Sequence, residues 1–284
     1  MQSCIDSVLQ VTGLELRLSH NHFDDQLIDN EEPIVWHEPV LDEYWNRLEK
    51  MVESWLSTTD IHTIYISNVE MKKERMAALV AMFLSGRATN SSGKVCFNNA
   101  NLCKEGIISM SKLVYVSPDL RALHLHHNRI DNTESARCLS KSVKLHARIT
   151  HLHLGHCNLG SSPEMLSVIL QSDVRYLGLI GNNIDSLGAV KIVEYLEGNP
   201  PIHQIDLDHN QLNDDDALLI SQALRRNTNL SQIFLRSNNF TSIGAKALLN
   251  CVFDASSLNA ISESNHTLRE IYFFYFSSCI DGML

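Results

Sequence analysis

The sequence predicts an α/β fold of stacked strand–helix repeats, with parallel strands on one side and helices on the other. The first observation is an apolar pattern, L-x-x-L-x-L-x-x-N/C-x-L, that recurs five times in succession. The second is a column of Asn or Cys within that pattern, at Asn128, Cys157, Asn182, Asn210 and Asn238, separated by 29, 25, 28 and 28 residues. The third is the helical spacing of apolar residues between copies.

Three weaker copies come first along the chain. They are GLELRLSHNHF (13–23), IHTIYISNVEM (61–71) and SGKVCFNNANL (92–102). The last two place Val69 and Ala100 in the asparagine column. We therefore expect degenerate repeats over residues 13–119, with an amphipathic helix over 29–60 packed on the array. A partner-binding amphipathic helix is the alternative for 29–60.

The five regular copies follow, within residues 120–258. They are LRALHLHHNRI (120–130), ITHLHLGHCNL (149–159), VRYLGLIGNNI (174–184), IHQIDLDHNQL (202–212) and LSQIFLRSNNF (230–240). Alternation turns the fourth and sixth positions inward, and the third, fifth and seventh onto the face that the strands share. A single strand cannot bury its inward apolar side chains alone, so successive copies should stack in parallel. The Asn or Cys column, including Cys157, is expected to be structural.

Helical patterns lie between these copies. GAVKIVEYLEGNPP (188–201) has one apolar face and ends at Gly and Pro, while DDDALLISQALRRNTN (214–229) begins with acids and ends with arginines. IGAKALLNCVF (243–253) repeats the spacing. The helices should form the convex side of a horseshoe and the strands its concave side.

The last copy is irregular. LREIYFFYFSSC (268–279) keeps three apolar positions and then loses the pattern. We expect residues 1–284 to form a single solenoid whose final repeat, 268–284, is uncapped. Such an open apolar edge predicts self-association, and a truncated sequence is the alternative explanation of the irregular last copy.

The pattern resembles the leucine-rich repeat of the ribonuclease-inhibitor-like class, including the repeat regions of NOD-like receptors and Ran GTPase-activating proteins. This resemblance covers essentially the whole chain and implies a protein-interaction scaffold. It leaves a GTPase-activating protein for a small Ran-like GTPase as the main alternative. No acidic tail and no matching catalytic residue support that alternative.

Composition excludes several other classes. The 23 basic against 33 acidic residues give a net charge of −10, which argues against nucleic acid as a partner. The first residues lack the pattern of a secretory signal, and no apolar run is long enough to span a membrane. Seven cysteines without a disulfide framework indicate reduced thiols. These features predict a cytoplasmic protein, with the nucleus as the other location.

Histidines concentrate in two neighbouring copies. His124 and His153 share the fifth position, so we expect them side by side on the strand face, with His126 and His151 nearby. A histidine-rich metal-binding protein is therefore a second alternative. A flat strand face projects side chains in parallel, whereas zinc needs converging ligands. We favour exposed or half-exposed polar residues over a metal site or a pH-sensitive surface, and expect no metal or cofactor.

Enzymatic motifs are weak. GRATNSSGKV (86–95) has the wrong glycine spacing for a phosphate loop and precedes a strand, and no Ser-His-Asp or Cys-His arrangement stands out. We therefore predict a non-catalytic protein that binds an unidentified partner protein on its concave face. Aromatic and apolar groups beside charges there suit an interface. Gly155, Gly178 and Gly181 should leave a shallow recess among them. The predicted partner-binding residues are His124, His153, Tyr176, Ile180, Asp206, Asp208, Phe234, Arg236 and Tyr272.

Overall fold

The structure, a computed structural model, divides into two compact units, Met1–Leu154 (unit 1) and Gly155–Leu284 (unit 2). It describes residues 15–19, 46, 50, 63–84, 93–253, 256, 257, 259 and 264–273. The amphipathic segment expected at 29–60 falls outside these residues apart from Asn46 and Lys50, as does the end of the final repeat after Phe273. Within these ranges, no helix is long and apolar enough to cross a membrane.

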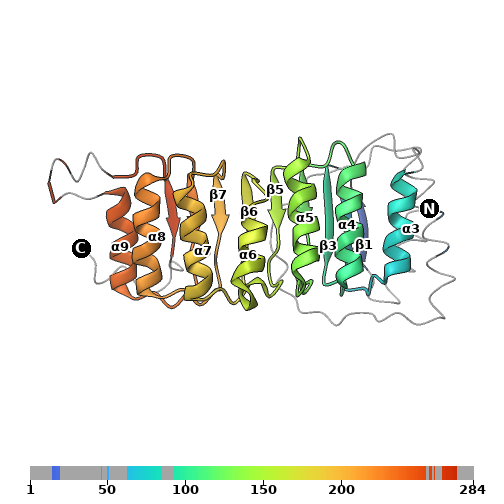
Figure 1. The fold of residues 1–284 in the computed structure, drawn as a ribbon, viewed down its shortest axis with the longest axis horizontal. Helices are drawn as coiled ribbons and strands as arrows, with labels where there is room; N and C mark the ends of the chain where they lie inside the picture. Colours follow the sequence, from blue (N-terminus) through green and yellow to red (C-terminus); the bar gives the residue numbers. More distant parts are fainter. Residues whose placement is uncertain are drawn as a thin grey trace. The chain divides into compact units, whose positions relative to one another are not determined.

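Unit 1 alternates strands with helices. Its elements are β1 (Glu15–Ser19), β2 (Thr63–Ser67), α3 (Lys73–Leu84), β3 (Lys94–Asn98), α4 (Lys104–Val116), β4 (Ala122–His124), α5 (Thr133–Leu145) and β5 (His151–His153). Strands β2 to β5 pair in sequence order and all in parallel, with their helices in a separate layer (Figure 1). The weak copies at 61–71 and 92–102 thus form strands of the predicted kind.

Strand β1 differs from the expectation. It pairs with β2 in antiparallel register, from Glu15↔Ser67 to Ser19↔Thr63, so the prediction of parallel stacking is wrong for the copy at 13–23. Parallel neighbours require a crossover connection, usually through a helix, whereas an antiparallel strand satisfies the edge of β2 without one. The segment between β1 and β2 is longer than one repeat, so the repeat length did not fix the direction of β1.

Unit 2 continues the alternation with very short strands. Its elements are η2 (Leu159–Ser161), α6 (Pro163–Leu170), β6 (Tyr176–Gly178), α7 (Ser186–Glu197), β7 (Gln204–Asp206), α8 (Asp214–Arg226), β8 (Gln232–Phe234), α9 (Ser242–Val252) and β9 (Glu270–Tyr272). Strands β6 to β9 pair in parallel and in sequence order. Helices α7, α8 and α9 lie side by side in front of them in Figure 1.

The core confirms the predicted alternation. The fourth and sixth positions of the regular copies are buried between strands and helices; in unit 2 they are Leu177, Leu179, Ile205, Leu207, Ile233 and Leu235. Each of these side chains is at most 2% exposed. Burial of a leucine-sized side chain contributes about 2 kcal/mol, so the column drives stacking of the repeats.

The asparagine column links each repeat to the one before it. The Asn210 amide nitrogen donates to the carbonyls of Leu207 at 3.0 Å and of Leu179, in the preceding repeat, at 3.1 Å. Its amide oxygen accepts from the backbone N–H groups of Asn182 and Ile184, each at 3.0 Å. Cys157 is buried in the same column, and its thiol lies 3.4 Å from the Gly155 carbonyl. Both residue types are structural here, as predicted.

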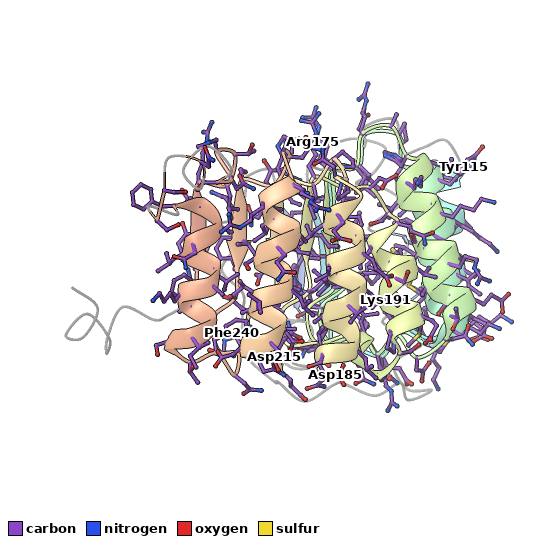
Figure 2. All side chains as sticks on the ribbon, turned by 60° about the vertical axis from the view of Figure 1, so that its left-hand side comes forward. Tyr115, Arg175, Asp185, Lys191, Asp215 and Phe240 are labelled. Atoms are coloured by element: carbon purple, nitrogen blue, oxygen red, sulfur yellow. The ribbon has the colours of Figure 1, made fainter. Side chains whose placement is uncertain are left out.

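Polar caps explain where the helices of unit 2 begin. The Asp185 side chain accepts from the first N–H groups of α7, and Asn213 forms a capping box with Asp216 on α8. Asp185 and Asp215 lie at the same end of these neighbouring helices in Figure 2, which fits helices that run in one direction. Asp214 reaches into the next repeat, where its carboxylate accepts from the N–H groups of Thr241 and Gly244 at α9.

Candidate functional site

The side of the strands that faces away from the helices is called the strand face, and in unit 2 it carries the predicted mixture of aromatic and charged groups. Tyr176, Asp206, Phe234 and Tyr272 come from four consecutive strands and are half-buried. The register pairs Asp206 with Phe234 and Phe234 with Tyr272, so these three side chains form one row across the sheet. Tyr176 lies two positions earlier, opposite Gln204.

The row includes two aromatic rings, Phe234 and Tyr272, and the guanidinium of Arg236 lies against them. The Phe234 and Tyr272 rings stack with centroids 4.5 Å apart and planes 8° from parallel. The Arg236 guanidinium carbon lies 4.8 Å from the Tyr272 ring centroid and 5.6 Å from that of Phe234. Tyr272 also donates its hydroxyl to Glu270 at 2.6 Å. These contacts hold a flat apolar surface and a positive charge in fixed relative positions.

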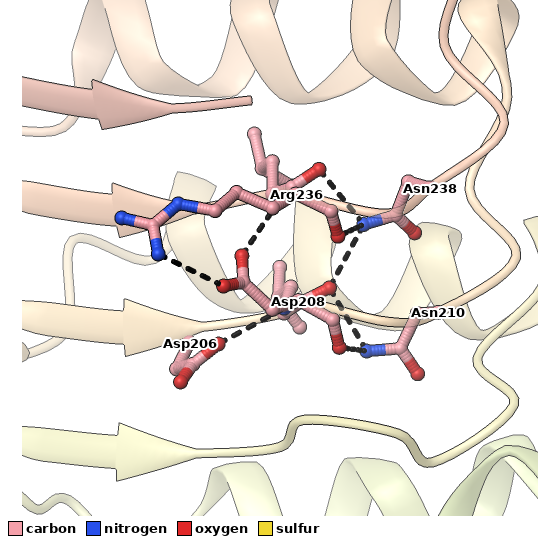
Figure 3. Close-up of polar contacts among 7 residues, drawn as sticks. Asp206, Asp208, Asn210, Arg236 and Asn238 are labelled. Carbon is pink, nitrogen blue, oxygen red and sulfur yellow. Dashed lines mark hydrogen bonds and ion pairs between the residues drawn. The ribbon is translucent and has the colours of Figure 1, made fainter. Parts of the chain in front are cut away.

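A pair of carboxylates adjoins this group (Figure 3). Asp206 accepts from the Asp208 N–H at 2.9 Å, and Asp208 accepts from the Arg236 N–H at 2.6 Å. The Asp208 carboxylate also lies 3.9 Å from the Arg236 guanidinium. Two carboxylates thus share one guanidinium, so the net charge of these three side chains is negative when both acids are ionised.

The electrostatics of this pair are unfavourable at neutral pH. Burial raises the pKa of Asp206 to about 6, and the nearby Asp208 carboxylate adds to this rise. Hydrogen bonding from the Asp208 N–H and the charge of Arg236 act in the opposite direction. Burial likewise raises the pKa of Asp208, against the opposing influence of Arg236. A positively charged group brought next to Asp206 would stabilise its ionised form.

Two predicted site residues of unit 2 are less accessible than expected. Ile180 is 7% exposed and Asp208 is 5% exposed, so neither presents much surface to a partner. Asp208 instead positions Arg236 through the contacts above. The recess expected at the glycines is also filled at Gly181, where a Cβ would come 2.2 Å from the His156 ring. Gly181 has φ of +65°, which favours glycine for a second reason.

In unit 1 the histidines are brought together, but not as expected. His124 and His153 are register partners whose rings stack with centroids 4.2 Å apart. His124 and His126 are each only 7% exposed, so the prediction of exposed or half-exposed side chains is wrong for these two and right for His153. Strand alternation specifies the side of the sheet on which a residue lies, but not how densely that side is covered.

No protein-family profile matches the chain. Among solved structures, an internalin from Listeria monocytogenes is 16% identical, with 78% of this chain and 50% of that chain covered and a TM-score of 0.40. A protein from Bacteroides fragilis is 11% identical, with 95% of this chain and 81% of that chain covered and a TM-score of 0.50. The chain thus spans about half the length of the internalin.

At these identities the likeness concerns the fold alone. The parallel strands, the helix layer and the asparagine column of the described residues together make this fold an α/β leucine-rich repeat solenoid.

Proposed function

We propose that the chain is a non-catalytic scaffold that binds a partner protein through the strand face of unit 2. The stacked Phe234 and Tyr272 rings beneath Arg236 carry this proposal, because they combine large aromatic area with low residual flexibility. This row lies outside the apolar core that packs the repeats together, which is on the other side of the strands. Tyr176 and Asp206 would extend the contact surface toward β6.

The acids favour a partner with a basic side chain at the contact. Asp206 is half-buried next to Asp208, and its raised pKa reflects an ionised form that lacks full compensation. A lysine or arginine of the partner would supply that charge, while an apolar neighbour packed on the aromatic rings. The predicted contact is therefore a basic residue flanked by apolar surface.

A double substitution tests this surface. A partner captured with the full chain and identified by mass spectrometry would be purified, and its affinity measured for wild type and for Tyr176→Ala with Phe234→Ala. We expect the double variant to lose more than about 2 kcal/mol of binding free energy, because aromatic contacts at interface centres commonly contribute that much. The melting temperature should stay near the wild-type value.

The matched control is Leu187→Ala with Ile243→Ala, two exposed apolar residues on α7 and α9. It should leave the affinity unchanged. Loss of binding in this control, with binding retained in Tyr176→Ala with Phe234→Ala, would move the interface to the helices and contradict the proposal.

We also propose that the repeats belong to the ribonuclease-inhibitor-like class and that the protein is intracellular. Repeats of 25 to 29 residues, each with a helix, support the ribonuclease-inhibitor-like class. An intracellular location is supported by the expectation of reduced cysteines, and the Cys251 thiol, whose pKa burial raises to about 11, is poorly suited to oxidation. Activation of a small GTPase remains the alternative prediction, and a GTP hydrolysis assay with Ran-like GTPases tests it.

A further inference from the structure

Three imidazoles converge on the strand face of unit 1. His124 ends β4, His153 ends β5, and His126 follows β4 two residues later. The His126 ring lies 5.7 Å from the His124 ring and 5.8 Å from the His153 ring, measured between centroids. With the 4.2 Å stack of His124 on His153, the rings form a compact triangle. One ring nitrogen from each histidine lies within 4.8 Å of the other two.

The backbone around this triangle is fixed by hydrogen bonds. The His153 carbonyl accepts from the Leu125 N–H at 2.9 Å, which holds the end of β5 against the chain between His124 and His126. The His126 N–H donates to the Asn98 side chain at 3.2 Å, and its carbonyl accepts from the Asn99 N–H at 2.8 Å. The three Cα positions are therefore set by the fold, and only side-chain rotation is left to adjust the ring nitrogens.

We propose that His124, His126 and His153 form a binding site for a divalent transition metal ion. Nitrogens that coordinate one tetrahedral Zn²⁺ at about 2.05 Å lie about 3.3 Å apart. Closing the observed triangle to that spacing requires ring shifts of about 1 Å, within reach of side-chain rotation. His153 is the half-buried member, so its rotation displaces the fewest neighbours.

The chemistry of the three groups selects the class of metal. Imidazole nitrogen suits Zn²⁺, Cu²⁺, Ni²⁺ and Co²⁺, whereas Mg²⁺ and Ca²⁺ require oxygen ligands, which this triangle lacks. Burial holds the pKa of His124 well below its ordinary value, with further lowering from His153, Lys94, His126 and His151. Neutral imidazole is the form that binds metal.

Three protein ligands leave a tetrahedral ion one further position. His151 lies beyond His153, with ring centroids 6.3 Å apart, and its Nδ1 lies 2.8 Å from the Thr150 hydroxyl. Water, or a side chain of a bound protein, would therefore complete the coordination. The competing explanation is a stack of neutral imidazoles that serves packing only, and it predicts no metal affinity.

The test uses the full chain freed of metal by dialysis against a chelator. Calorimetric titration with Zn²⁺ should give one ion per chain with a Kd below about 1 µM, and Co²⁺ should give the intense visible absorption of tetrahedral coordination. His153→Gln should weaken binding at least about 100-fold, since loss of a ligand exceeds the effect of a supporting group. His203→Gln, an exposed histidine of unit 2, is the matched control and should bind as wild type.

A second variant keeps the test decisive if His153→Gln does not fold. His153→Cys should retain metal and add a thiolate-to-cobalt charge-transfer band in the near ultraviolet, which a packing role does not predict. The proposal is overturned by a wild-type Kd weaker than about 100 µM, by unchanged affinity in a folded His153→Gln chain, or by the absence of that band. The site lies in unit 1, so these outcomes are separate from partner binding through unit 2.

Discussion

Asp206 shows what a repeat pattern specifies about a single residue and what it does not. Its place in the fifth position predicted a side chain on the strand face, and the structure confirms that placement. Its raised pKa could not be predicted, because it depends on the solvent excluded around the carboxylate and on Asp208 and Arg236. The burial of His124 is the same kind of property: side-chain packing, rather than strand alternation, determines it.

Replacement of Asp206 by asparagine should stabilise the protein at neutral pH. The pKa in the folded state, about 6, lies above the ordinary value of 3.8, so the folded chain binds a proton more readily than the unfolded chain between these values. Ionised Asp206 therefore reduces stability at pH 7, and this loss is relieved as the pH falls from 6 toward 4. We expect Asp206→Asn to raise the free energy of unfolding by about 1 to 2 kcal/mol at pH 7 and by little at pH 4.

Urea titrations at pH 7 and pH 4 measure this effect. The amide oxygen of asparagine can still accept from the Asp208 N–H, so the local hydrogen bond is preserved. Glu197→Gln, which removes an exposed carboxylate from the end of α7, serves as the control and should change stability little at either pH. An Asp206→Asn chain less stable than wild type at pH 7 would show that the carboxylate is compensated in the folded state.

At the scale of the elements, the sequence specified most of the architecture. The spacing of leucines located strands β4 to β8, because only inward positions of a repeated strand must all be apolar. The start of one helix was predicted less well: the helical pattern was read from Gly188, whereas α7 begins at Ser186 because Asp185 caps it, and it ends at Gly198 as expected. The direction of β1 was missed because the segment between β1 and β2 is longer than one repeat, so the repeat length did not fix how β1 pairs.

Substitution in the asparagine column should reduce folding stability more than substitution of the other polar residues of these elements. Asn210 is 5% exposed and bonds to backbone groups of two successive repeats, including Leu179, Asn182 and Ile184. Alanine would leave these buried groups without partners, and each such loss costs about 1 to 3 kcal/mol. We expect Asn210→Ala to lower the free energy of unfolding by at least about 3 kcal/mol.

Thermal or urea unfolding followed by circular dichroism measures this loss. Gln211→Ala is the neighbouring control: Gln211 is exposed, and its change should stay within about 0.5 kcal/mol. Equal stabilities of Asn210→Ala and wild type would mean that water satisfies the turn, and that the column does not link the repeats.

At the scale of the whole molecule, the chain is acidic, with a net charge of −10. Each unit has its own apolar core between strands and helices, and most charged side chains in the described part of the chain lie outside these cores. A negative field of this size repels acidic proteins and accelerates the approach of basic ones, because charged surfaces steer diffusional encounter. The carboxylates beside the aromatic pair of unit 2 give the same preference at short range.

The association rate with a captured partner should therefore fall as salt is added. Between about 50 and 500 mM NaCl the screening length drops from roughly 14 to 4 Å, which removes most long-range attraction. We expect the association rate constant to decrease at least about 10-fold over this range, while the dissociation rate changes less, because contacts on the aromatic rings are not screened. Surface-based kinetics at several salt concentrations measure both rates.

Asp206→Asn should flatten the salt dependence of the association rate, since it removes a negative charge at the contact, whereas Phe234→Ala should raise the dissociation rate and leave the salt dependence as in wild type. An association rate that rises with salt would indicate an acidic partner, and would contradict the basic contact proposed for this face.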